Sequence, residues 1–362
     1  MTQGMIGALC RAGFESECGQ ELMAVAAEAG LFGYFQSSRN SGWVLLLLPD
    51  PQQARTLMSR VNWEQLVFAR EWFLGLALVS LPESDRVSAV LEALKEESTR
   101  GQGPLGPFSR LEIQVPDSDR VSGDVQQFAR KWTAPLSRAL RQSGRLVEDS
   151  ESPRLDLVLS DFDEVFMGLT FPGNRSPYLG GIPRLRMPAS APSRSTLKLE
   201  EAWKLFIPED QWLSTLGNGA QAVDLGAAPG GWTWQLVEQG MMVHAVDNGP
   251  MDPALMASGH VTHVQEDAFS WRPRRAVDWL VCDIADKPAR VTALMGLWLT
   301  QGLCRHCLFN LKLPMKQRWE TWLECRERLE QTLRKAGLRY RIRARHLYHD
   351  REEITCYVQR LD

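Results

Sequence analysis

The chain has 362 residues, of which 44% are hydrophobic and 23% are charged. This length suits two or three domains, and the apolar share is large enough for real hydrophobic cores, which excludes a globally disordered chain. The formal net charge of -3 excludes a uniformly basic nucleic-acid binder. A local basic face stays open, because only the contacting surface has to neutralise phosphates.

Cysteine usage and apolar runs bear on compartment and partners. Seven scattered cysteines form no even framework, so we expect reduced thiols in a cytoplasmic protein. Cys304 and Cys307 form a lone C-x-x-C pair. A structural zinc ion needs four ligands, so we expect no metal and interpret both as small apolar residues entering a strand. The apolar run 44–48 is far too short to span a bilayer, and we expect no membrane partner.

The first 170 residues mix strand and helix patterns. The predicted segments are a strand at 5–10, a helix at 15–27, a strand at 42–48, a helix at 87–97, a strand at 110–115, a helix at 125–142 and a strand at 155–159. Pro135 lies inside the last helix and is expected to kink or split it, because proline removes a backbone donor. This mixed order predicts an N-terminal α+β region over residues 1–170, built from two small modules.

A change of composition follows at residues 171–192, which contain five prolines and three glycines. Proline fixes φ and withholds a backbone donor, so this stretch is typical of an extended connector. We interpret it as a Pro/Gly-rich linker and place the main domain boundary there. Residues 193–362 then form a domain of their own.

Strand and helix patterns alternate more regularly in this last domain. The predicted strands cover 220–225, 242–246, 261–265, 279–282, 307–311, 338–345 and 354–359, and one predicted helix covers 231–239. Such alternation predicts a doubly wound α/β sheet. The last two strands leave no room for a crossover helix, so we expect an antiparallel hairpin on the sheet edge. This layout is typical of a Rossmann-like class I methyltransferase domain.

A cofactor loop follows the first of these strands. The strand ends in Asp224, a turn with three glycines occupies 226–231, and a helix comes next, which is a cofactor-binding pattern. Asp247 closes the next strand, 23 residues after Asp224 (247 − 224), where an acid can accept bonds from ribose hydroxyls. Asp267 follows the third strand, where it can accept a bond from an adenine amino group.

The same loop decides between two cofactors. A dinucleotide fingerprint needs a middle glycine to admit the pyrophosphate, but Ala228 occupies that position and Pro229 follows. S-adenosylmethionine has no pyrophosphate, so the loop favours this methyl donor. A nicotinamide dinucleotide is the second interpretation, and a plain strand-turn-helix is the third.

Four polar residues fall where a Rossmann-like site would use them. They are Lys198, Asp283, Lys312 and Glu353. Lys198 follows Ser195, a candidate N-cap of a helix, and the other three lie at strand ends. Methyl transfer to an alcohol needs a base, and a lysine at its ordinary pKa near 10.4 is charged. A second lysine or desolvation would lower that pKa towards a useful value.

These stretches resemble the bacterial ribosomal RNA large-subunit methyltransferase M family. The matching stretches are 10–15, 181–185, 191–202, 224–233, 246–251, 310–316 and 347–353. The resemblance covers the full chain and implies S-adenosylmethionine-dependent methylation of a cytidine 2′-O-ribose in 23S ribosomal RNA. It also implies a ferredoxin-like segment and a THUMP RNA-binding domain in residues 1–170. The substrate is naked rRNA or a precursor of the large subunit, and we expect a monomer.

The family in turn resembles 2′-O-methyltransferases that carry a Lys-Asp-Lys-Glu tetrad. This implies that Lys312 is the proton acceptor and that Lys198, Asp283 and Glu353 complete the tetrad. Glu352 is left as an alternative to Glu353, because adjacent strand residues face opposite sides. The residues that correspond to cofactor contacts are Ser195, Ala228, Pro229, Gly230, Gly231, Asp247, Asp267 and Asp283.

Three basic segments are candidates for RNA contact. A solvated face is an equally open interpretation of the helix, whereas the strand and linker segments favour RNA contact over a charged edge strand that only prevents aggregation. They comprise Arg130, Lys131, Arg138, Arg141 and Arg145 on a helix; Arg339, Arg341, Arg343 and Arg345 on one face of a strand; and Arg175, Arg184, Arg186 and Arg194 in and after the linker. Tyr178 lies among the last group, where it can stack on an unpaired base. Two other function classes stay open: a dehydrogenase, and a non-enzymatic RNA-binding or assembly factor with a relic site.

Overall fold

The computed structural model describes residues 3–101, 105–217 and 219–361. The chain divides into two compact units, Met1–Ile182 and Pro183–Asp362. The division falls inside the 171–192 stretch. Within the described ranges, the helices lack the length and apolar character that crossing a membrane requires.

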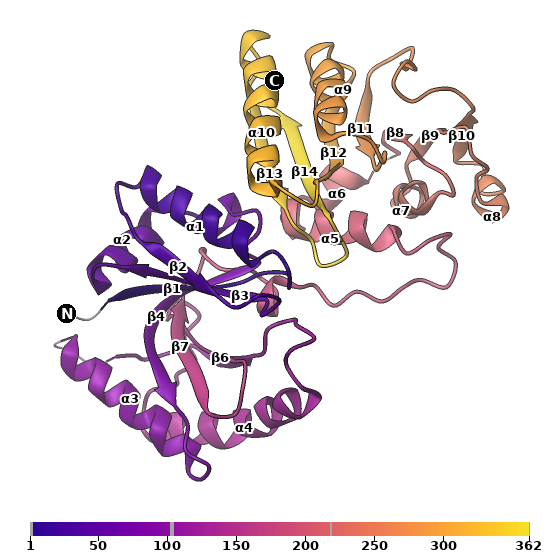
Figure 1. Ribbon diagram of the computed structural model, residues 1–362. Coiled ribbons are helices and arrows are strands. Elements are labelled where there is room, and N and C mark those ends of the chain that lie inside the picture. Colours follow the sequence, from indigo (N-terminus) through magenta and orange to yellow (C-terminus); the bar gives the residue numbers. More distant parts are fainter. Residues whose placement is uncertain (1–2, 102–104, 218, 362) are drawn as a thin grey trace. The chain divides into compact units, whose positions relative to one another are not determined.

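The first unit is built on one sheet of seven strands (Figure 1). The strands are β1 (Gly4–Leu9), β2 (Tyr34–Ser37), β3 (Trp43–Leu48), β4 (Glu71–Ser80), β5 (Leu111–Gln114), β6 (Arg154–Leu159) and β7 (Glu164–Thr170). The α-helices are α1 (Glu15–Glu28), α2 (Pro51–Arg60), α3 (Arg86–Arg100) and α4 (Gly123–Gln142). The strands lie in the order β2-β3-β1-β4-β7-β6-β5.

The two predicted α+β modules share this single sheet. The elements from β1 to β4 follow a β-α-β-β-α-β order, and β1 pairs antiparallel with both β3 and β4. Strand β4 then pairs antiparallel with β7, the inner strand of the second module. Because β4 pairs with a strand of each module, the sheet is continuous between them.

Helix α4 excludes a split at Pro135, one of the two effects that we expected of this proline, and leaves the kink as a prediction. It runs from Gly123 to Gln142 with Pro135 inside it, so proline does not split it. Pro135 is exposed. On the solvent side a helix can bend outward to accommodate the ring and the lost backbone bond.

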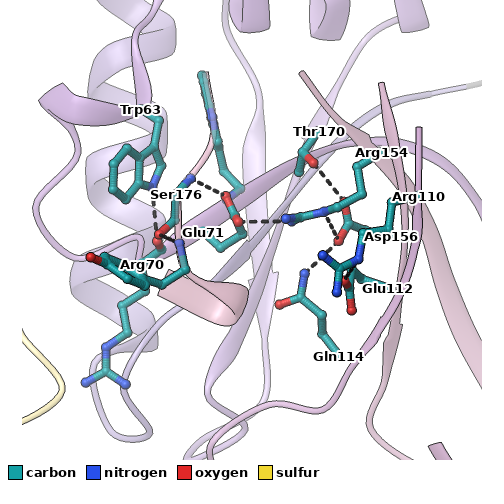
Figure 2. Close-up of polar contacts among 12 residues, drawn as sticks. Trp63, Arg70, Glu71, Arg110, Glu112, Gln114, Arg154, Asp156, Thr170 and Ser176 are labelled. Carbon is teal, nitrogen blue, oxygen red and sulfur yellow. Dashed lines mark hydrogen bonds and ion pairs between the residues drawn. The ribbon is translucent and has the colours of Figure 1, made fainter. Parts of the chain in front are cut away.

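A buried cluster of charges lies where the two modules join (Figure 2). Arg154 of β6 donates from Nη2 to Glu71 Oε2 of β4 at 3.1 Å and from Nε to Asp156 Oδ1 at 2.9 Å. Gln114 and Thr170 also donate to Asp156. Burial raises the pKa of Glu71 to about 7, although the charge of Arg154 acts against it. The cluster therefore ties β4 to the strands beyond β7 with buried, hydrogen-bonded charges.

The second unit also contains one seven-stranded sheet. Its strands are β8 (Gln221–Leu225), β9 (Met242–Val246), β10 (Val261–Val264), β11 (Val277–Cys282), β12 (Cys304–Lys312), β13 (Tyr340–Arg345) and β14 (Glu353–Arg360). The α-helices are α5 (Thr196–Phe206), α6 (Trp212–Leu216), α7 (Gly231–Glu238), α8 (Pro253–Met256), α9 (Pro288–Thr300) and α10 (Arg318–Lys335). Cys304 and Cys307 lie buried in β12.

The strand order β10-β9-β8-β11-β12-β14-β13 confirms the predicted Rossmann-like sheet. Strands β8 to β12 pair in parallel, while β14 pairs antiparallel with both β12 and β13. The closing hairpin thus lies at the sheet edge, as predicted. Leu199, Ala202, Trp203 and Phe206 of α5 are buried together in a core that includes Trp279 of β11. This packing fixes α5, and with it Lys198, against the sheet.

Candidate active site

The candidate site lies at one edge of the second sheet. Strands β8, β11 and β12 are parallel, so their carboxyl ends meet at the same edge, where open α/β sheets form sites. The cofactor loop follows β8, Asp283 follows β11, and Lys312 is the last residue of β12. Glu353 begins the antiparallel β14 and is the register partner of Lys312.

Glycines shape the loop after β8. Gly226 has φ 80° and Gly230 has φ 117°, values that a side chain disfavours. A Cβ on Gly231 would lie 2.2 Å from Ser195 Oγ and 2.3 Å from Ser193 Oγ. A side chain at this position would therefore force both serine hydroxyls to move from their places beside the start of α7.

Asp247 holds the loop from the neighbouring strand. Its Oδ2 accepts from the Ala228 backbone N–H at 3.1 Å and its Oδ1 accepts from that of Gly249 at 2.7 Å. Each carboxylate oxygen keeps a second lone pair, so Asp247 can still accept from a ligand hydroxyl. The tight glycine turn with a carboxylate beside it fits a small adenosyl cofactor.

Ser195 and Asp267, two further residues predicted to contact the cofactor, lie in different surroundings. Ser195 has helical backbone angles, and its Oγ lies 2.7 Å from Ser193 Oγ. It is therefore not the N-cap that we predicted, because a cap needs an extended backbone to turn its side chain towards the helix start. Asp267 is exposed after β10 and accepts from the Phe269 N–H at 3.2 Å.

Asp224 in β8 supports the cofactor loop from the strand that precedes it. It is buried, and its Oδ2 accepts from Thr233 Oγ1 of α7 at 2.7 Å. Burial raises its pKa to about 7. Asp224 thus joins the end of β8 to the helix that follows the loop.

Three members of the predicted tetrad are in direct contact. Lys198 Nζ lies 3.6 Å from Asp283 Oδ2 and is hydrogen-bonded to Glu353 Oε1. The three side chains are only 13%, 19% and 8% exposed, respectively. Lys312 lies opposite Glu353 in the strand pair, and its charge acts on that carboxylate.

Burial and neighbouring charges shift the pKa values of Lys198 and Glu353 in opposite directions. Burial alone would lower the pKa of Lys198, but the charges of Asp283 and Asp350 and the bond to Glu353 outweigh it, and the pKa is raised. Burial alone would raise the pKa of Glu353, but the bond to Lys198 and the charge of Lys312 lower it. We expected desolvation or a second lysine to lower the pKa of a lysine in the tetrad. This expectation is wrong for Lys198, whose raised pKa keeps it positively charged.

The structure separates the two adjacent glutamates. Glu353 is buried against Lys198, whereas Glu352 is exposed and pairs with Arg318 Nη2 at 2.5 Å. Glu352 lies in the bend just before β14, whereas Glu353 is the first residue of that buried strand. Of the two alternatives, Glu353 is the one that lies beside the lysines.

A buried polar chain behind Asp283 was not predicted from the sequence. Asn310 Nδ2 donates to Asp283 Oδ1 at 2.8 Å, and Thr355 Oγ1 donates to Asn310 Oδ1 at 2.7 Å. Thr355 Oγ1 also lies 3.1 Å from Asp350 Oδ2. Asn310 interrupts an otherwise apolar stretch of β12 and Thr355 one of β14, and that interruption is the signal which could have revealed them.

The predicted basic strand face is only partly available. Arg339 and Arg341 are exposed, but Arg343 is half-buried and donates to the Phe206 carbonyl at 2.8 Å. Arg345 is buried. The exposed basic surface is smaller than predicted because the C-terminal end of β13 packs against the rest of its domain. On α4, Arg130 and its basic neighbours Lys131, Arg138 and Arg141 are exposed, and Arg145 is half-buried.

Three family models match the chain in succession. They are the RlmM ferredoxin-like domain at residues 2–73, the N-terminal model of ribosomal RNA large subunit methyltransferase M at 85–171, and the FtsJ-like methyltransferase at 191–303. Ribosomal RNA large subunit methyltransferase M of Marinobacter nauticus is 58% identical over 357 residues, which cover 98% of each chain. The chain belongs to the ribosomal RNA large subunit methyltransferase M family.

A second relative agrees with this membership. The protein of the same name from Chromohalobacter salexigens is 46% identical over 356 residues, covering 98% of this chain and 97% of that one. TrmN from Thermus thermophilus is a distant likeness, with 14% identity over 99% of this chain and 100% of that one and a TM-score of 0.37.

Family membership confirms the resemblance and the ferredoxin-like segment. It also confirms S-adenosylmethionine as the cofactor and rules out the dehydrogenase. The 85–171 match bears the family's own N-terminal description, so a THUMP domain there stays a prediction.

Proposed function

We propose that this protein methylates the 2′-oxygen of a cytidine ribose in 23S ribosomal RNA, with Lys312 as general base. The assignment of Lys312 as the base rests on the charge of the other lysine, Lys198. Within the described residues, both ion pairs of the tetrad are made by Lys198, whose pKa is raised. A lysine held as a cation by two carboxylates cannot take a proton from a hydroxyl.

The four side chains then have separate roles. Bound S-adenosylmethionine supplies an electrophilic methyl group on sulfur. Lys312 is placed to accept the proton of the 2′-hydroxyl as the oxygen attacks the methyl carbon and the carbon–sulfur bond breaks. Lys198 stays charged and stabilises the negative charge that develops on that oxygen. Asp283 and Glu353 hold Lys198 in place.

The cofactor residues and the substrate belong to the same proposal. Ser195, the loop 228–231, Asp247 and Asp267 are proposed to contact the cofactor, together with Asp283. The choice of a cytidine, the large-subunit RNA or its precursor as partner, the cytoplasmic location and the monomeric state all rest on the family. Domain limits at 1–170, 171–192 and 193–362 are proposed on the same basis.

A methyl-transfer assay tests this function. Purified protein with labelled S-adenosylmethionine should methylate 23S rRNA from cells that lack the protein, and mapping should place the methyl on one ribose. Lys312→Ala should slow transfer by about 10²- to 10⁴-fold, the usual range for a general base, while cofactor affinity persists. A fully active Lys312→Ala enzyme would remove Lys312 as the base. Tight rRNA binding without transfer on any preparation would support the non-enzymatic alternative.

A further inference from the structure

The loop between β13 and β14 is held in place by a buried carboxylate that the proposed chemistry does not use. Glu201 of α5 is fully buried. Its Oε1 accepts from the Tyr348 N–H at 2.8 Å, and its Oε2 accepts from the His349 N–H at 3.0 Å and lies 2.6 Å from His349 Nδ1. Three bonds to one buried carboxylate fix both backbone and ring in this loop.

An aromatic ring and a guanidinium group meet on this loop. Arg184 lies over the ring of Tyr348, with its central carbon 5.8 Å from the ring centroid. The His349 ring stands edge-on to Tyr348, at 5.2 Å and 86°. Arg184 is exposed, and Tyr348 and His349 are half-buried. Arg184 belongs to the stretch 181–185 and Tyr348 to the stretch 347–353, and both stretches resemble the family. Apart from Glu353, neither stretch contributes to the tetrad. The two stretches therefore contact each other through Arg184 and Tyr348.

The pair lies close to the tetrad. Glu201 comes three residues after Lys198 on α5, so both project from the same side of that helix. Asp350, two residues after Tyr348, interacts through its charge with Lys198 and with Glu353, the tetrad's glutamate. The loop that carries Tyr348 thus ends at the tetrad's own glutamate.

We propose that Arg184 and Tyr348 form a stacking platform for a nucleobase of the unpaired RNA segment that carries the reactive ribose. Single-stranded RNA is recognised by stacking its bases on aromatic rings and guanidinium planes. A ring anchored through its backbone to a buried carboxylate loses little freedom when a base stacks on it. This inference rests on the proposed function. Tyr178, the aromatic predicted from the sequence, belongs to the other unit and stays a separate candidate.

Substitutions at Tyr348 test the platform. The probe is 23S rRNA from cells that lack the protein, with its dissociation constant measured over a range of salt concentrations. Tyr348→Leu should weaken binding by about 10-fold, within the range that loss of one stacked base produces, and should leave the salt dependence unchanged because no charge is lost. Tyr348→Phe should bind as the wild type does. Equal affinity of the Leu and Phe variants would overturn the proposal.

Matched variants separate stacking from charge and from misfolding. Arg184→Ala should weaken binding more than Arg186→Ala, which removes an exposed charge from the same segment. Trp212→Leu removes an aromatic that also carries a cation, Lys204 at 5.0 Å, and should leave RNA affinity unchanged. Cofactor affinity and melting temperature report folding, and if Tyr348→Leu does not fold, Arg184→Ala against Arg186→Ala decides. Equal losses at these two arginines would overturn the platform.

The two proposals fail separately. If mapping places the methyl on a base, the ribose assignment is wrong, yet the RNA affinity of the Tyr348 variants still judges the platform. If the methyl is on a ribose and Tyr348→Leu binds rRNA normally, the platform is wrong and the proposed function stands.

Discussion

Replacing Lys198 with methionine would leave two carboxylates of the tetrad without their cation. Lys198, Asp283 and Glu353 are 13%, 19% and 8% exposed, so solvent screens the remaining charges poorly. Breaking a buried ion pair by removing one partner costs about 3–5 kcal/mol. In a unit of this size 1 kcal/mol shifts the melting temperature by about 2–4 °C. We therefore expect Lys198→Met to melt at least several degrees below the wild type near neutral pH.

The pH dependence of this loss follows from the pKa shifts. The pKa of Lys198 is raised above its ordinary 10.5, so its contribution is complete below that value and is lost as the pH rises through the folded-state pKa. The pKa of Glu353 is lowered from 4.5, so its contribution is present above 4.5 and is lost as the pH falls. The stability gap between wild type and Lys198→Met should thus be widest between these limits and shrink in acid.

Urea unfolding of both proteins at several pH values measures the gap, with Lys204→Met as control. Lys204 lies on the same helix but contacts Trp212 instead of the tetrad, so its loss should cost about 1 kcal/mol or less at every pH. The double variant Lys198→Met/Glu353→Gln should be less destabilised than the two single variants combined. A gap for Lys198→Met that is constant with pH would refute the charge argument.

Three further predictions concern other parts of the fold. Gly231→Ala should cost about 1–3 kcal/mol and weaken S-adenosylmethionine binding in calorimetry, because its Cβ would meet a serine oxygen at 2.2 Å; Gly123→Ala, in open space, should do neither. Asn310→Leu should lower kcat, because it removes the donor that holds Asp283 in place; an unchanged kcat would contradict this. Glu71 has its pKa raised from 4.5 to about 7, so stability falls as the pH rises across that interval. Urea unfolding of the first unit should lose this slope in Glu71→Gln, and a slope that persists would assign it elsewhere.

The sheet of the second unit was predictable because its central strands β8, β11 and β12 are largely apolar and mostly buried. The predicted strand 242–246 matches β9 residue for residue, and the other boundaries moved by a few residues. The first unit was harder. Strand β2 is mostly exposed, so little apolar pattern marks it. Strand β4 begins at Glu71, a buried carboxylate. Its ion-pair partner, Arg154, lies 83 residues away in the sequence, so the local pattern does not reveal why Glu71 can be buried.

The contact of Lys198 with Asp283 and Glu353 could be predicted because each of these residues lies at or next to the start or end of a regular element. Parallel strands bring their carboxyl ends together whatever their sequence separation, so residue type and position are enough. Asn310 and Glu201 could not be assigned in this way. Their roles depend on partners that register alone places beside them: Asp283 for the amide, and the 348–349 backbone for the carboxylate.

Two lysines and two carboxylates are more than a proton acceptor needs, and charge balance explains why all four are present. Lys198 contributes one positive charge and Asp283 and Glu353 one negative charge each, so these three side chains together carry a net charge of -1 (1 − 2). A proton that arrives beside them compensates this charge, and an uncompensated charge is most costly where water is excluded. The carboxylates thus hold Lys198 as a cation and also favour the arrival of the substrate's proton at the site.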